Sequence, residues 1–172
     1  SAMSLGEMTR VLQNLLEEGI PVRDMRTIAE ALADQSGKGQ DSDALTAKVR
    51  IALGPSIFQN INGTADEMSV MALDSKLEQI LLGSIHQGAG GLEPSLLDSV
   101  IRQVLEASAK LEAEGKNPVL LVAGNIRLFL SRLLRGRMAN FYILAYDEIP
   151  STKTIKVVAT IGGSAGALQG AK

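Results

Sequence analysis

The sequence contains no cysteine and no tryptophan among its 172 residues, and it has a single histidine, His86. The absence of cysteine excludes disulfide bonds, thiol catalysis and thiolate metal sites. A single histidine excludes a multi-histidine metal site and leaves one possible member for a histidine-based triad. Aromatic residues make up 3% of the chain, too few for platforms that stack bases or sugars. We therefore expect no catalytic residue, no metal and no cofactor.

Long hydrophobic runs and a strong charge of one sign are also missing. Apolar runs such as Val119–Ala123 fall far below the roughly 20 residues that a membrane-spanning helix needs. The formal net charge is -2, from 17 basic and 19 acidic residues, so no basic excess supports binding to nucleic acid. A content of 45% hydrophobic and 21% charged residues is typical of a globular protein with a real core.

Helical periodicity dominates the first third of the chain. Apolar residues recur there at spacings of three and four, the pattern of an amphipathic helix. The pattern predicts helices over Met8–Leu16, Met25–Leu32 and Leu45–Leu53. The pair Gly54-Pro55 is expected to stop or kink the third helix. We predict a small helical bundle over residues 5–59.

Strand-like and helix-like segments alternate after a turn at Asn60–Asp66. The expected strands are Met68–Leu73, Pro118–Ala123, Phe141–Ala145 and Ile155–Ile161. The expected helices are Leu77–Ile85, Pro94–Leu111 and Ile126–Leu134. This alternation predicts an α/β domain over residues 60–163, with a roughly four-stranded sheet and flanking helices, in a chain that is α+β overall. Residues 164–172, small and polar, are expected to form a flexible tail.

One segment has the position of an anion site. Gly124-Asn125 follows an expected strand and opens an expected helix, and backbone N–H groups at a helix start can hold an anion, with Arg127 assisting. A glycine in such a turn is common without any ligand. A small anion-binding or nucleotide-binding α/β module is therefore the weaker alternative for the function.

A basic stretch gives the stronger indication of binding. It consists of Arg127, Arg132, Arg135 and Arg137, with no acidic residue between Ala123 and Ala145. Arg132 and Arg135 share a helix face at i, i+3, whereas Arg127 lies well around the helix from both. The stretch is either a solvated helix face or a contact patch for an acidic partner.

A pair of adjacent carboxylates, Asp147-Glu148, does not suggest acid–base catalysis. Neighbouring residues on a strand point to opposite faces, so the two would not act together. With Ile149-Pro150-Ser151 they are typical of a turn. The residues alone thus favour a binding or structural protein over an enzyme.

The segment Val11–Ile28 closely resembles a signature of the FlhA family, the large export-gate proteins of bacterial flagellar type III secretion. Further similar segments follow in the same order and extend the resemblance from about Met8 to Gly163. They include Glu30–Leu32, Leu45-Thr46 with Val49–Gly54, Gly90–Pro94, Pro118–Val122, Ile126-Arg127 with Phe129–Arg132, Asp147–Pro150 and Ile155–Gly162. Pro55 departs from the family pattern, where the helix is expected to continue, and residues 164–172 extend beyond the usual end. The ordered set is specific and favours the flagellar proteins over the virulence secretion homologues, which stay the alternative.

The resemblance implies that this chain is a C-terminal cytoplasmic fragment. It would comprise part of a helical third subdomain and an α/β fourth subdomain of a protein whose absent N-terminal half lies in the bacterial inner membrane. The full-length protein would form a nonameric ring, with Val22, Arg23, Asp24 and Arg26 as candidate ring contacts. The fragment would therefore be part of a docking and ring-forming platform for the export of flagellar proteins.

The resemblance also implies a set of partners. The export ATPase stalk and other export apparatus proteins would bind the fourth subdomain, which gives the basic stretch a use. Substrates and chaperones would bind mainly through subdomains that this chain lacks. Contact with the membrane would occur only through the absent half, and none with nucleic acid is expected.

Overall fold

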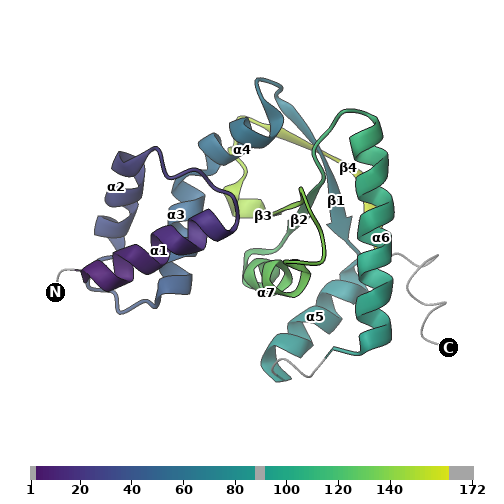
Figure 1. Ribbon diagram of the computed structural model, residues 1–172, viewed down its shortest axis with the longest axis horizontal. Coiled ribbons are helices and arrows are strands. Elements are labelled where there is room, and N and C mark those ends of the chain that lie inside the picture. Colours follow the sequence, from purple (N-terminus) through teal and green to yellow (C-terminus); the bar gives the residue numbers. More distant parts are fainter. Residues whose placement is uncertain (1–2, 88–91, 163–172) are drawn as a thin grey trace. The chain divides into compact units, whose positions relative to one another are not determined.

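The computed structural model describes residues 3–87 and 92–162, which form two compact units (Figure 1). The first unit contains the chain up to Gly63 together with Asp147–Pro150. The second contains Thr64–Tyr146 and the chain from Ser151 onward. The predicted boundary between residues 59 and 60 falls inside a helix of the first unit, and the tail predicted over residues 164–172 lies outside the described residues.

The first unit is helical. Its elements are α1 (Leu5–Glu17), α2 (Met25–Gln35), α3 (Ser42–Ala52) and α4 (Gly54–Asn62). The three predicted helices are confirmed, and α1 and α2 both pack against α3. The apolar stripes that predicted these helices form the interior of the unit, as amphipathic periodicity requires. Their buried members include Val11, Leu15, Ile28, Leu32, Leu45 and Val49.

The fourth helix is a departure from the prediction. The sequence predicts that Gly54-Pro55 stops the third helix, and α3 does end just before this pair, at Ala52. Pro55 itself stands in the first turn of α4, where the missing backbone N–H of proline costs nothing. Leu53 closes α3 through its N–H to the Val49 carbonyl and begins α4 through its carbonyl to the Ile57 N–H. The glycine–proline pair therefore joins two helices, and Pro55 has the regular geometry of a helix start.

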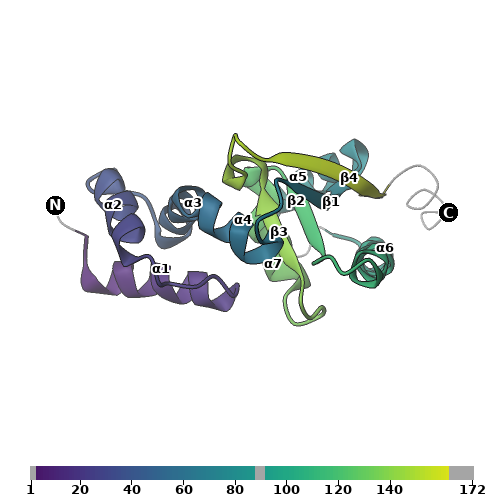
Figure 2. The same ribbon diagram turned by 90° about the horizontal axis from the view of Figure 1, so that it is seen from above.

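The second unit is built on a parallel sheet. Its strands are β1 (Glu67–Leu73), β2 (Val119–Val122), β3 (Tyr142–Ala145) and β4 (Thr154–Ile161). The strand order is β3-β2-β1-β4 and all three pairings are parallel, so β1 lies between β2 and β4 (Figures 1 and 2). The predicted α/β fold with a four-stranded sheet is confirmed.

Three helices, α5 (Ser75–Gln87), α6 (Pro94–Ala113) and α7 (Gly124–Leu134), complete this unit. Their apolar stripes form one core with the strands, centred on Met71, Leu81, Val104, Leu120 and Ile126. A short 3-10 helix, Tyr146–Glu148, follows β3 directly. In the described residues, none of the helices is both long and apolar enough to span a membrane.

The edge strand β4 is irregular. Val70 pairs with Val157, but Met71 pairs with Ala159, so Val158 is an extra residue in β4. This β-bulge twists the edge of the sheet locally. The strand ends at Ile161, and Gly162 follows it with a φ of 82°, which favours glycine. A Cβ at this position would also press on the Leu77 side chain.

Candidate functional site

The predicted ring-contact residues flank a groove within the first unit. The segment between α1 and α2 faces α4 across a cavity of about 430 Å³. Arg23 and Asp24 line it, together with Pro21 from the same segment and Ile57 from α4. Ile20 and Ile57 are buried at its base, while Arg23 and Asp24 are exposed. The result is a shallow groove with an apolar base and a charged rim.

Asp24 gives this segment its shape. Its carboxylate caps α2, accepting from the Thr27 backbone N–H at 3.1 Å and from the Thr27 hydroxyl at 2.6 Å. The hydrogen bond with the Thr27 side chain lowers the pKa of Asp24 below its usual value. Arg26 pairs with Glu30 one turn further along α2 at 3.1 Å, and both side chains are exposed. The half-buried Val22 lies between these charged positions and the groove residue Pro21.

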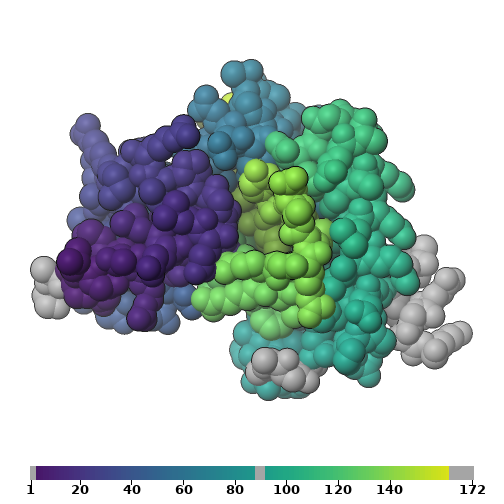
Figure 3. Space-filling view, viewed as in Figure 1, coloured from purple at the N-terminus to yellow at the C-terminus, as the bar shows by residue number. Residues whose placement is uncertain are grey.

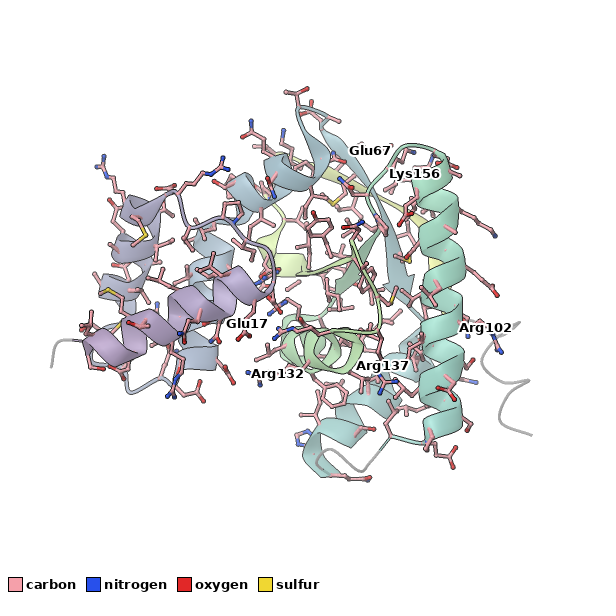
Figure 4. The ribbon with its side chains drawn as sticks, viewed as in Figure 1. Glu17, Glu67, Arg102, Arg132, Arg137 and Lys156 are labelled. Carbon is pink, nitrogen blue, oxygen red and sulfur yellow. The ribbon has the colours of Figure 1, made fainter. Side chains whose placement is uncertain are left out.

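The predicted basic stretch is divided by the fold. Arg132 lies in the last turn of α7, Arg135 caps its C-terminus, and Arg137 follows Gly136. All three are exposed, and Figure 4 shows Arg132 and Arg137 at the surface beside α7. Positive charges near a helix C-terminus are favoured by the helix dipole. We name Arg132, Arg135 and Arg137 the basic segment.

Arg127 is not part of that exposed segment. It is buried, at 5% exposure, and its guanidinium Nη1 donates to the Ile143 carbonyl of β3 at 3.5 Å. Its burial follows from a spacing visible in the sequence, because Arg127, Leu130 and Leu134 stand at i, i+3 and i+7 on the buried side of α7. Its side chain therefore faces the sheet. The alternative anion site at Gly124-Asn125 is left with the backbone N–H groups of the helix start, without the assistance expected from Arg127.

A buried charge cluster in the first unit was not predicted. The Arg50 guanidinium of α3 donates to Glu148 through Nε at 2.5 Å and Nη2 at 3.1 Å, and to Glu18 through Nη1 at 2.6 Å. Arg50 and Glu148 are both almost completely buried. Paired carboxylates and hydrogen bonds compensate the cost of burying the guanidinium. The turn at Asp147-Glu148 is thus a structural anchor for the helical unit.

The backbone of the same turn contacts α4. Gly54 is buried, and a Cβ at this position would overlap the Glu148 carbonyl oxygen. Glycine is therefore required where α3 meets α4, because only hydrogen leaves room for the turn. In the sequence, Arg50, Glu18, Gly54 and Glu148 are separate residues that no local pattern connects.

The sites described above are built from charged and apolar side chains. Within residues 3–87 and 92–162, no group of three or more acidic or histidine side chains is arranged to hold a metal ion. The exposed features are instead a rimmed groove beside α4 and a basic segment beyond α7.

Comparison with known proteins gives the family. A model of the FHIPEP family matches residues 1–154. The chain belongs to the FHIPEP family. It is 44% identical over 161 residues to the flagellar biosynthesis protein FlhA of Escherichia coli K12, a match that covers 94% of this chain and 23% of FlhA. The chain thus spans about a quarter of the length of FlhA, and the predicted resemblance to the FlhA family is confirmed.

Two solved structures share the fold of this chain. The Chlamydia pneumoniae CdsV and CdsO complex matches with a TM-score of 0.79 at 26% identity, covering 92% of this chain and 47% of that chain. The nonameric EscV cytosolic domain from the type III secretion system matches with a TM-score of 0.75 at 28% identity, covering 91% of this chain and 47% of that chain. A fold similar to that of this chain is therefore seen in a nonameric assembly of EscV and in a complex of CdsV with CdsO.

Proposed function

We propose that this chain is part of the cytoplasmic region of a flagellar protein export gate, where it has no enzymatic role and acts as a docking and ring-forming platform. The observation that carries this proposal is the 44% identity to FlhA along 94% of the chain. The identity to the type III secretion protein EscV is lower, at 28%, which favours a flagellar gate over a virulence secretion gate. The full-length protein would lie in the bacterial inner membrane.

Ring formation is proposed to use the groove beside α4. A cyclic assembly joins two different surfaces of each subunit, so one surface must receive another. The groove at Arg23 and Asp24 supports this role because it combines an apolar base with charges of both signs at the rim. The nonameric form of EscV supports an assembly of this kind for the full-length protein. Val22 and Arg26 extend the same surface along the chain.

The basic segment is proposed to bind an acidic surface of the export ATPase stalk or another export apparatus protein. Three exposed arginines at the end of α7 provide the charge, and such charges accelerate and orient the approach of an acidic partner. The complex of CdsV with CdsO supports the idea that this fold presents a docking surface. Substrates and chaperones are proposed to bind mainly elsewhere in the full-length protein.

A chimera tests the export function. The 161 matching residues of E. coli FlhA are replaced by this chain, and swimming is measured in a strain without FlhA. We expect motility to be restored. Loss of motility, with the chimera present at the normal level and other membrane proteins unaffected, would show that this chain does not serve a flagellar gate.

Two sets of charge reversals then separate the surfaces. Arg23→Glu with Arg26→Glu should reduce ring formation of the chimeric cytoplasmic region, measured by light scattering. Arg132→Glu with Arg135→Glu and Arg137→Glu should leave the ring intact and weaken stalk binding in a pull-down. Arg102→Glu, which reverses another exposed arginine, on α6 (Figure 4), is the matched control. Equal effects of the control and either set would contradict the assignment of that surface.

A further inference from the structure

The outer edge of β4 has the features of a binding site for a peptide backbone. Within the described residues, β4 pairs only with β1. The Thr154 N–H donates to the Asp66 carbonyl, and the Ile161 carbonyl accepts from the Asp74 N–H, so these groups face the β1 side. Alternate residues of a strand bond to opposite sides. The backbone groups of Ile155, Val157 and Thr160 therefore face away from β1.

A groove runs beside this edge. It has a volume of about 280 Å³ and lies between α6 and the last four residues of β4, Val158–Ile161. Ala107, Leu111 and Ala159 provide small or apolar side chains along it. The outer flank of α6 lies at the molecular surface (Figure 3). The groove therefore lies next to backbone groups that pair with no other strand in the part of the chain that the structure describes.

The edge also exposes apolar side chains. Val157 is 54% exposed and Val158 is 42% exposed, on a strand whose protection consists of the bulge and one lysine, Lys156. Natural proteins usually block an open edge more completely, since an exposed edge pairs with other strands. An edge left this open is suited to receive an extended segment as an added strand.

The charges beside the groove indicate which side chains the added strand would carry. Its charged lining residues are Glu106, Lys110 and Glu114, all from α6, with a net charge of -1. Glu106 and Glu114 are separated by eight residues, about 12 Å along a helix. Four residues of an extended strand span about 13 Å. Basic side chains at positions i and i+4 of an added strand would lie on one face and match the two glutamates.

We propose that the β4 edge and the α6 groove bind an extended segment of an unfolded polypeptide, with basic side chains four residues apart and an apolar one between them. Main-chain hydrogen bonds would supply most of the affinity and would tolerate many sequences. The identification of this polypeptide as export cargo rests on the proposed function. The binding site itself rests on the geometry of β4 and α6.

A synthetic peptide provides the test. The probe is fluorescein-labelled Thr-Lys-Thr-Val-Thr-Lys-Thr, and its binding to the purified chain is followed by fluorescence anisotropy. Amide hydrogen exchange reports which backbone groups become protected. We expect saturable binding with protection at Thr160 and Val157. A peptide of the same sequence, N-methylated at alternate residues so that it cannot donate along one edge, should not bind.

Two pairs of protein variants locate the site. Thr160→Pro removes the outward N–H, a change that an edge position tolerates. It should raise the Kd of the peptide at least tenfold, or about 1.4 kcal/mol. Thr160→Ala keeps that N–H, and its Kd should stay within about twofold of the wild-type value. Glu106→Lys with Glu114→Lys should weaken binding of the lysine peptide about tenfold and favour a glutamate version. Glu112→Lys, an exposed α6 residue outside the groove, is the control for charge.

Several independent results would overturn the proposed peptide-binding site. Binding that survives N-methylation of the peptide, or that responds equally to Glu112→Lys and to the groove variants, would overturn it. The same holds for the absence of saturable binding, or for a dimer of the chain that dissociates on Thr160→Pro, because a second copy would then occupy the edge. A chimera that restores motility without peptide binding would overturn this inference alone. Peptide binding by a chain that fails in the chimera would overturn the export function alone.

Discussion

The Arg50 side chain of α3 and the Glu148 side chain, 98 positions later in the sequence, form a buried ion pair with an N–O distance of 2.5 Å. Glu18 completes the cluster from the end of α1, with 2.6 Å between its Oε2 and Arg50 Nη1. Removing one partner of a buried ion pair strongly destabilises a protein, because the remaining charge stays buried without compensation. The first prediction follows from this effect.

Glu148→Gln should lower the free energy of unfolding by about 3 kcal/mol, because it leaves Arg50 buried with one carboxylate in place of two. Chemical denaturation at pH 7 measures the change. Asp147→Asn removes the same charge from the exposed neighbouring residue and should change the free energy by less than about 0.5 kcal/mol. Similar losses for both variants would show that the ion pair does not stabilise the helical unit.

Gly54→Ala should destabilise the protein by about 2 kcal/mol, although alanine is the better helix former, because its methyl group would overlap the Glu148 carbonyl. Gly83→Ala in α5 is the matched control, since a Cβ there meets nothing within 4 Å. That variant should gain about 0.5 to 1 kcal/mol from helix propensity alone. Thermal denaturation should show a lower melting temperature for Gly54→Ala and a higher one for Gly83→Ala. An increase for both variants would contradict the close approach at Gly54.

Gly162→Ala should be more harmful than Gly115→Ala, although both glycines have positive φ, 82° and 75°. A Cβ at position 115 meets nothing within 4 Å, whereas one at position 162 presses on Leu77. We expect a loss of about 1 kcal/mol at Gly115 from backbone strain and about 2 to 3 kcal/mol at Gly162 from strain plus overpacking. Leu77→Ala should reduce the additional cost of Gly162→Ala, which a double-mutant cycle measures. Additive effects would contradict a direct clash.

Asp66 should make the stability depend on pH in the acid range. Its hydrogen bond with the Lys153 side chain, 2.9 Å long, lowers the pKa of Asp66 below the usual 3.8. A lowered pKa means that the ionised form is favoured by folding, so the contribution is complete above the usual value and is lost as the pH falls through the folded-state pKa.

The measurement compares wild type with Asp66→Asn in urea denaturation between pH 7 and pH 2. Wild type should be the more stable at pH 7, and the difference should disappear at the acid end. In a Lys153→Gln background the difference should shrink at every pH, because Lys153 is the main cause of the shift. A difference that grows on acidification would show that the sign is wrong.

The local features of the fold could be predicted from the sequence because they depend on neighbouring residues. The apolar periodicity of Leu97–Leu111 and the β-branched run at Ile155–Ile161 correctly indicated α6 and β4. The capping of α2 by Asp24 is local in the same sense, because it needs only Thr27, three residues away. The α4 helix was missed because the Gly54-Pro55 pair looks like a helix end and is also a sound helix start.

Features that depend on residues far apart were not accessible in the same way. Nothing near Glu148 shows that a guanidinium 98 positions earlier lies against it, so the turn assigned from Asp147 to Ser151 concealed a buried anchor. The edge position of β4 depends on the strand order, and the groove beside it depends on where α6 packs. Arg127 is an intermediate case: its basic neighbours drew attention to charge, whereas its spacing from Leu130 and Leu134 indicated burial.

The short segment Asp147–Pro150 has a consequence for comparing and recombining these proteins. It belongs to the helical unit, yet it is encoded between two strands of the sheet. A gene exchange that replaces only the sequence for the α/β unit would therefore import a foreign turn into the helical unit. Functional hybrids should be recovered where the two parents supply residues at positions 50, 54 and 148 that fit together. Where the parents differ at these positions, hybrids with a crossover near Gly63 should be rare among the viable ones.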